Sequence, residues 1–197
     1  MNRQHALEDN VNEALIALVG AVEARDVHTR DQAVRVHRMV ERLTNMFRMD
    51  SEQRQKICNA ALIHNIGLVS VPDAILLKPG RLNEAERQVI EASVCVASAI
   101  LEPIKSLGEE RLLILHQGER WDGAGYPDGL KKRDIPIGSR FIAVANAIDA
   151  MTQNRAYRRA RPISYCLGQL RENAGSQFDP KIAEAAAAML CKGGRDR

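Results

Sequence analysis

The residues best suited to chemistry or recognition gather in one loop and the helix expected after it, over residues 119–152. Glycine and proline are frequent there, and large aromatic side chains stand among them. Aromatic side chains presented in this way commonly anchor protein interfaces. The loop therefore contains four candidate partner-binding residues, namely Trp121, Gly125, Tyr126 and Pro127. The alternative is that Trp121 packs inward and that Tyr126 makes only local hydrogen bonds.

Basic residues form two groups that could hold phosphate. One is RAYRRAR, residues 155–161, and the other is the KPGR turn, residues 78–81. Guanidinium groups match the geometry of phosphate oxygens and of the guanine edge. The candidate ligand-binding residues are Lys78 and Arg81, together with Arg155 and Arg158, which are chosen from their run by the family resemblance given below. The alternative is a solvated basic run, and it is the preferred reading for Arg159 and Arg161.

Other arrangements that could support catalysis are weak. His37 and Glu41 lie four residues apart and could share a metal ion, although a solvated surface contact is the commoner outcome for such a pair. There is no Gly-x-Ser-x-Gly motif and no glycine-rich phosphate loop before a helix. The four cysteines are isolated in the sequence, which favours unlinked thiols in a reducing cytosol.

Length and charge limit the class of protein. The chain has 197 residues, which suits one domain with a substantial core. Its formal net charge of +3 is too small to indicate a nucleic-acid binder. No stretch approaches the roughly 18 apolar residues that a membrane span needs. We therefore expect a cytoplasmic protein that binds neither nucleic acid nor membrane.

Hydrophobic spacing predicts an all-α fold, a single helical domain with roughly seven to nine helices. The expected helices cover residues 6–25, 29–48, 51–67, 83–103, 109–117, 139–151, 163–174 and 180–191. Ser51 is the expected N-cap of the third, and Asn83 with Glu86 forms a capping-box pattern. VSVPDAI is the best strand candidate, although it is short. Residues 1–25 are interpreted as a separate dimerisation or linker helix, and residues 26–197 as the main domain.

Several spaced segments resemble one known family. EARDVHT, VPDAILLKPG, ERWDGAGYPDGL, IPIGSR, AMTQNRAYR and GSQFDP are similar to segments of the HD-GYP family of metal-dependent cyclic di-GMP phosphodiesterases, and the resemblance covers residues 20–188. It implies the helical fold of the HD superfamily and a place in bacterial cyclic di-GMP signalling. It also implies that the loop can dock GGDEF-type cyclases or other signalling proteins.

The resemblance further implies a metal centre, and the matching positions depart from it. These positions are Gln32, His64, Asn65, Ser93, Gln117, Gly118 and Asn146. Only His64 keeps a strong metal ligand, because amide oxygens are neutral and glycine has no side chain. Leu68 also replaces the lysine that usually follows the His-Asp pair. A hydrolase of this kind needs its cations to activate water and neutralise phosphate charge. We therefore expect no metal cofactor.

The resulting interpretation is a degenerate, catalytically inactive HD-GYP domain, a pseudoenzyme that acts as a cyclic di-GMP receptor, a protein-interaction module, or both. One alternative is a residual metal-dependent cyclic di-GMP phosphodiesterase with a site rebuilt around His64, for which the available residues are His37, Glu41, His116, Asp122 and Asp149. The other is a purely structural partner domain without nucleotide affinity. A homodimer through residues 6–25 is a further hypothesis.

Overall fold

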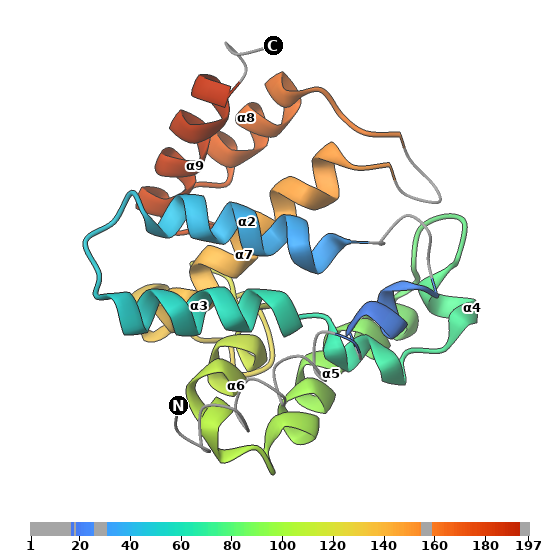
Figure 1. Ribbon diagram of the computed structural model, residues 1–197. Coiled ribbons are helices and arrows are strands. Elements are labelled where there is room, and N and C mark those ends of the chain that lie inside the picture. Colours follow the sequence, from blue (N-terminus) through green and yellow to red (C-terminus); the bar gives the residue numbers. More distant parts are fainter. Residues whose placement is uncertain (1–16, 18, 26–30, 155–158, 194–197) are drawn as a thin grey trace.

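The computed structural model describes residues 17, 19–25, 31–154 and 159–193, and their regular structure is helical (Figure 1). Residues 19–23 are helical. The α-helices that follow are α2 (Gln32–Thr44), α3 (Ser51–Ile63), α4 (Asp73–Leu76), α5 (Glu84–Leu101), α6 (Gly108–Leu115), α7 (Ile137–Thr152), α8 (Ile163–Glu172) and α9 (Pro180–Gly193). Short 3-10 helices are η1 (Ile66–Ser70), η2 (Lys105–Leu107) and η3 (Lys132–Asp134). The predicted all-α fold is confirmed.

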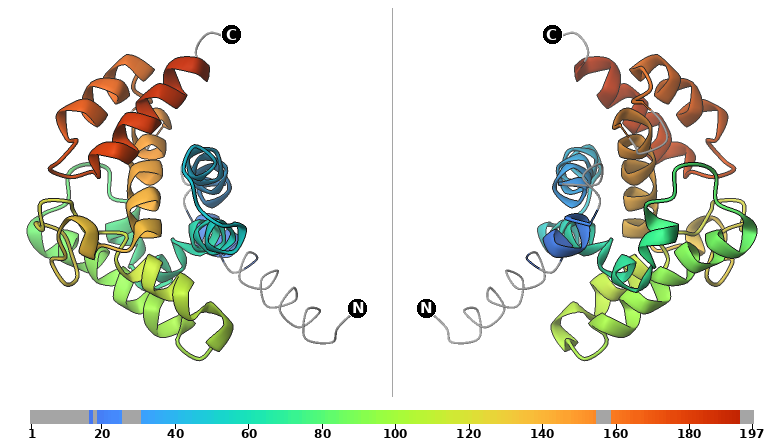
Figure 2. Two further views of the ribbon diagram at one scale, coloured as in Figure 1. Left: turned by 90° about the vertical axis from the view of Figure 1, so that its left-hand side faces the viewer. Right: turned by 90° about the vertical axis from the view of Figure 1, so that its right-hand side faces the viewer.

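Helix α7 lies at the centre of the molecule. It contacts α2, α3, α6, α8 and α9. In Figure 2 the α2–α3 pair stands on one side of it, with α8 and α9 above and α5 and α6 below. Because α7 meets neighbours on several sides, it is apolar around much of its circumference, and Phe141, Val144 and Ile148 are all buried. Among the described residues, no helix is long and apolar enough to cross a bilayer.

Local sequence signals explain most helix ends. The capping box is confirmed, because Asn83 Oδ1 accepts from the Glu86 amide at 2.9 Å and Glu86 Oε2 accepts from the Asn83 amide at 2.8 Å. The prediction that Ser51 caps α3 is wrong by one residue. The N-cap is Asp50, whose carboxylate accepts from the Gln53 amide at 2.7 Å.

Two other expectations about local structure are also corrected. The strand candidate VSVPDAI forms the end of η1 and the short helix α4, with Pro72 immediately before α4. Proline is favourable beside a helix start and unfavourable inside a sheet. Helix α7 begins at Ile137, directly after Pro136 and two residues before the expected Ser139. Only part of the expected helix 6–25 lies within the described residues, and the division at residue 25 stays a prediction.

Helix α2 is capped by a residue distant in sequence. Its own N-cap, Asp31, has a φ of 59° and makes no side-chain capping hydrogen bond. Instead, Glu23 Oε1 accepts from the Ala33 amide at 2.8 Å. Val19 and Val22, on the same segment as Glu23, are buried, and Val19 belongs to the main core cluster. The described end of the N-terminal segment is therefore packed into the fold and holds the start of α2.

Candidate functional site

A cleft of about 850 Å³ opens where the start of α2, the η1–α4 segment, the start of α5, the loop after α6 and one face of α7 meet. Its volume lies within the usual range of ligand pockets, about 300–1,000 Å³. Five carboxamide side chains line it, namely Gln32, Asn65, Gln117, Asn146 and Gln177. Four of these are positions singled out in the sequence, so the fold brings them together from four separate elements.

Hydrogen bonds between uncharged groups organise the floor of the cleft. Gln32 Nε2 donates to Asn146 Oδ1 at 2.8 Å, joining α2 to α7. Gln117 Nε2 donates to the His64 carbonyl oxygen at 2.8 Å. His64 is buried, and its Nδ1 lies 2.8 Å from the Ala61 carbonyl oxygen, which fixes the ring proton on Nδ1 because a carbonyl can only accept.

Ser93 is not among the residues that line the cleft. Its hydroxyl donates to the Ile90 carbonyl oxygen of its own helix at 2.6 Å. Its backbone instead meets η1, since a Cβ atom at Gly67 would overlap the Ser93 carbonyl oxygen. Ser93 and Gly67 thus form a close backbone contact between α5 and η1, and this contact sets the position of the η1–α4 wall.

Gly118 lines the cleft, and the ring of Tyr126 occupies the space beside it. A Cβ atom at Gly118 would overlap three atoms of that ring. Burial raises the pKa of the Tyr126 hydroxyl above its ordinary value, and the nearby charge of Glu91 raises it further. Tyr126 also lines the cleft. Its raised pKa favours the neutral form of the hydroxyl.

These residues do not fit a pair of divalent cations. Within the described residues no group of three or more His, Cys, Asp or Glu side chains is placed to hold a metal ion. Gln32 and Asn146 are bonded to each other, and Tyr126 fills the space in which a ligand at position 118 would project. Neutral amides also give divalent cations little of the charge that retains them.

The charged residues of the cleft are mostly basic. Among the described residues, the charged side chains that line it are Lys78, Arg81, Arg87, Arg120 and Glu119. Four positive charges facing one carboxylate make the cleft suitable for an anion. Sequence reasoning found Lys78 and Arg81 but missed Arg87, Arg120 and Glu119. The capping-box helix start and the ERWDG segment are the signals that could have indicated them.

Three of these cations already have carboxylate partners. Lys78 Nζ lies 2.6 Å from Glu86 Oε2, and this contact holds the pKa of Glu86 below its ordinary value. Arg120 Nη2 lies 2.7 Å from Asp122 Oδ2, and Arg87 pairs with Glu84.

Arg81 is the exception. It is exposed at the cleft and makes no hydrogen bond or ion pair with the described part of the chain. It is therefore the cation whose donors are most available to a ligand.

Other titratable candidates lie outside the cleft lining. His37 Nδ1 lies 2.9 Å from the Cys58 carbonyl oxygen, and no ion pair joins His37 to Glu41 among the described residues. His116 is buried, and its Nε2 lies 2.9 Å from Asp128 Oδ2 in the loop. Asp149 forms an ion pair with Arg35, at 2.6 Å between Oδ1 and Nε. None of these three groups forms a rebuilt site around His64.

The loop presents its aromatic residues in different ways. The Arg140 guanidinium carbon lies 5.9 Å from the centre of the half-buried Trp121 ring, and the Trp121 amide donates to the Gln177 carbonyl oxygen at 3.2 Å. Pro127 is exposed and follows a cis peptide bond, whereas Gly125 is half-buried. Partner docking through this loop stays a prediction. Arg155 and Arg158 lie outside the described residues.

Comparisons with known proteins agree with this architecture. A family model described as an HD domain matches residues 17–182. A cyclic di-GMP phosphodiesterase from Thermotoga maritima is 36% identical over 182 residues, which are 90% of this chain and 49% of that protein. The cyclic di-GMP phosphodiesterase response regulator RpfG from Xanthomonas campestris is 32% identical over 181 residues, which are 91% of this chain and 48% of that protein. The chain thus spans about half the length of these relatives.

Solved structures show the same fold. A cyclic GMP-AMP-specific phosphodiesterase from Vibrio cholerae, V-cGAP3, aligns with a TM-score of 0.70 at 16% identity, covering 93% of this chain and 49% of that one. Bd1817, an HDG"Y"P protein from Bdellovibrio bacteriovorus, aligns with a TM-score of 0.66 at 16% identity, covering 81% of this chain and 51% of that one.

One prediction from the sequence is wrong in the light of these relatives. The chain was expected not to be an enzyme, yet curated relatives at 32–36% identity are named phosphodiesterases of cyclic dinucleotides, which points to an enzyme. The prediction depended on a few substituted positions, whereas the similarity extends over about 90% of the chain. With a matching family model over residues 17–182, the chain belongs to the HD domain family.

Proposed function

We propose that the chain binds a cyclic dinucleotide in the cleft. The observation that carries the proposal is the charge of the lining, in which Lys78, Arg81, Arg87 and Arg120 face the single carboxylate of Glu119 among the described residues. A cyclic dinucleotide carries two phosphates, and guanidinium groups match phosphate oxygens in charge and geometry. The names of the relatives support this ligand class, since they include cyclic di-GMP and 3'3'-cGAMP.

Arg81 is the residue that we expect to contact a phosphate first. Within the described residues, the Arg81 guanidinium has no ion pair or hydrogen bond that ligand binding would have to break. Lys78, in contrast, is paired with Glu86. Lys78 and Arg87 lie near Arg81 around the turn that leads into α5, and both also line the cleft. A phosphate at this turn would meet several donors at the cost of few existing contacts.

The amide floor offers groups that suit a guanine base. Gln117 Nε2 is engaged by the His64 carbonyl oxygen, which fixes the orientation of the amide. Its Oε1 is buried and has no hydrogen-bond partner in the described structure. Guanine presents N–H donors that such an acceptor can satisfy, and an unsatisfied buried acceptor costs about 1–3 kcal/mol. Leu68, Ile75 and Leu76 supply apolar surface at the same cleft.

Hydrolysis of the bound ligand is a second proposed function, and the names of the relatives favour it. The reaction would add water across one phosphodiester bond and release a linear dinucleotide. Because the amide centre does not fit a metal pair, we assign no step of this reaction to a cation. Measuring the hydrolysis of a cyclic dinucleotide by the chain decides whether hydrolysis accompanies binding.

Calorimetry with cyclic di-GMP tests the binding function in the full chain. We expect Arg81→Ala to weaken binding roughly 10- to 100-fold, which is the value of one or two charged hydrogen bonds. Arg38→Ala is the matched control, because Arg38 is an exposed arginine of α2 that does not line the cleft. Absence of binding at millimolar ligand, or equal losses in both variants, would overturn the proposal.

The same samples test hydrolysis by chromatography of the nucleotides after incubation with Mn²⁺, with EDTA, or with neither. We expect a linear dinucleotide to accumulate with wild-type protein and to accumulate more slowly with Arg81→Ala. Unchanged cyclic di-GMP under all three conditions would contradict hydrolysis and leave the binding function standing.

A further inference from the structure

Two charged residues at the end of the N-terminal helical segment, Glu23 and Arg25, contact separate parts of the cleft's surroundings. Glu23 is 6% exposed, and its carboxylate accepts from the Ala33 amide at 2.8 Å. Burial raises the pKa of Glu23, while the Ala33 hydrogen bond and the Asn65 amide lower it. Ala33 directly follows Gln32, and both Gln32 and Asn65 line the cleft. The Glu23 carboxylate thus bonds to the residue that directly follows Gln32 of the amide floor.

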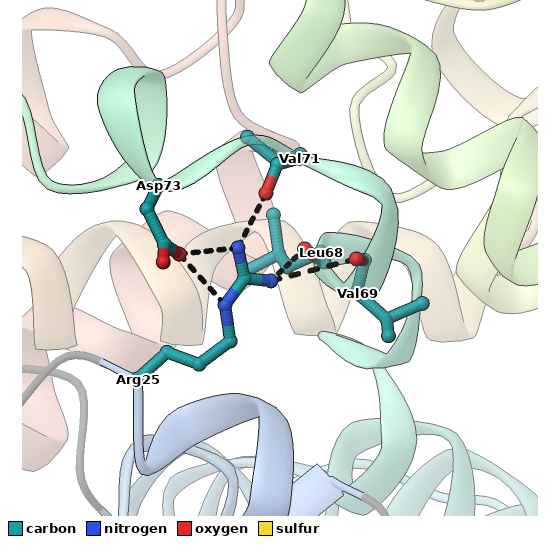
Figure 3. Close-up of polar contacts among 5 residues, drawn as sticks. All are labelled: Arg25, Leu68, Val69, Val71 and Asp73. Carbon is teal, nitrogen blue, oxygen red and sulfur yellow. Dashed lines mark hydrogen bonds and ion pairs between the residues drawn. The ribbon is translucent and has the colours of Figure 1, made fainter.

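Arg25 reaches in a different direction, into the bend between η1 and α4 (Figure 3). Its Nη2 donates to the Val71 carbonyl oxygen at 2.6 Å, and its Nη1 donates to the Leu68 carbonyl oxygen at 3.0 Å and more weakly to that of Val69 at 3.5 Å. Nε and Nη2 lie 2.9 and 2.6 Å from Asp73 Oδ1. All three guanidinium nitrogens are therefore engaged within residues 68–73.

This bend belongs to a wall of the cleft. Leu68, Ile75 and Leu76 of the segment line the cleft, as does Lys78 directly after it. Arg25 itself is not part of the lining. The segment is otherwise fixed by the close backbone contact between Gly67 and Ser93. Arg25 consequently supplies a second hold on the wall, from the N-terminal segment.

We infer that Glu23 and Arg25 are positioning residues of the cleft, so that ligand affinity depends on where the N-terminal helical segment lies. The inference rests on the proposed binding function. Glu23 fixes the start of α2 beside Gln32, and Arg25 fixes the wall that carries Leu68 and Lys78. A displacement of this single turn would move both sides of the cleft at once.

Hydrogen exchange of the full chain without ligand tests the hold on the wall. In Arg25→Ala we expect amides within residues 66–78 to exchange about tenfold faster, while those of α7 stay unchanged. Lys56→Ala is the matched control, because Lys56 of α3 also joins two elements, through Glu109 of α6, but does not line the cleft. Unchanged exchange in residues 66–78, or the same increase in Lys56→Ala, would overturn the inference.

Calorimetry with cyclic di-GMP tests the consequence for affinity. Arg25→Ala should weaken binding about tenfold, and Lys56→Ala should bind as wild type does. Arg25→Lys should fall between wild type and Arg25→Ala, since an ammonium can reach Asp73 but lacks the fork that spans the carbonyl oxygens. Wild-type affinity in Arg25→Ala would refute the positioning role. Failure of the wild-type chain to bind would instead refute the proposed function, and the exchange result would still decide whether Arg25 holds the wall.

Discussion

At the floor of the cleft, Gln32 and Asn146 bond to each other, and Asn146 Oδ1 accepts from the Gln32 amide nitrogen. The sequence shows that both side chains are uncharged, but it does not show that they are partners, because they lie 114 positions apart. The sequence likewise does not show that the Tyr126 ring lies against Gly118. The residue types at these positions indicated weak metal ligation. Only the folded structure shows which side-chain contacts occupy the place where metal ions would lie.

Glu110 provides a residue-scale prediction about pH. It is buried on α6, its Oε2 has no hydrogen-bond partner in the described structure, and burial raises its pKa above the ordinary 4.5. The folded state therefore binds this proton more tightly than the unfolded state, so stability falls as the pH rises above about 4.5 toward the folded pKa. Glu110→Gln should remove that loss and gain about 1 kcal/mol in the free energy of unfolding at pH 7.

Urea unfolding at pH 4.5 and pH 7 measures this effect. The difference in unfolding free energy between the two pH values should be smaller in Glu110→Gln than in wild type. Glu41→Gln is the control, because Glu41 is exposed on α2. An identical pH dependence in wild type and Glu110→Gln would show that the buried carboxylate costs nothing.

Residues that act over long sequence distances were the ones that sequence reasoning missed. Glu23 caps α2 at Ala33 although Asp31 occupies the N-cap position, and Arg25 binds carbonyl oxygens more than 40 positions away. A helix cap can be predicted from sequence only when the capping residue directly precedes the helix in the chain. Arg81 and Lys78 were predicted as ligand-binding residues because they stand in a recognisable turn. Arg120 was not predicted, because the aromatic residues beside it were interpreted as a partner-binding loop.

At the scale of helices, the sequence predicted the presence of each element better than its ends. The helices expected at 83–103 and 180–191 are α5 and α9, since a capping box and a helix-starting proline are local signals. The expected helix 51–67 ends at Ile63 and continues as η1. That break depends on the contact of Gly67 with α5, which no local pattern encodes.

The contact between η1 and α5 gives the element-scale prediction. Gly67 has no room for a Cβ atom, and the atoms in its way belong to the backbone of Ser93 and Ala97. Backbone cannot rotate aside as a side chain can, so Gly67→Ala should lower the free energy of unfolding by about 1–3 kcal/mol. Urea unfolding measures the loss, and Gly108→Ala, where a Cβ atom meets nothing within 4 Å, is the control. Equal stability of both variants would contradict tight packing at Gly67.

The whole molecule is assembled around α7, and one ion pair fastens it to α2. Asp149 of α7 is 1% exposed and pairs with Arg35 of α2 through Nε and Nη2. Removing Arg35 would take away a cation that pairs directly with this buried carboxylate. We therefore expect Arg35→Ala to cost ~3 kcal/mol in the free energy of unfolding.

A double variant separates charge from packing at this pair. Arg35→Ala with Asp149→Asn should recover part of the loss, because the remaining amide carries no charge into the interior. Thermal or urea unfolding of wild type, single and double variants gives the comparison. Equal stability of the single and double variants would mean that packing of the arginine stem, and not the ion pair, joins α2 to α7.

The chain contains one tryptophan, Trp121, and the structure places it in the loop after α6 with the Arg140 guanidinium near its ring. The adjacent Arg120 lines the cleft. Emission excited at the indole band therefore arises from this loop alone, and no dye or engineered label is needed to follow it. Changes in its intensity or wavelength on mixing with nucleotides or proteins would give an optical record of events at this edge of the cleft in real time.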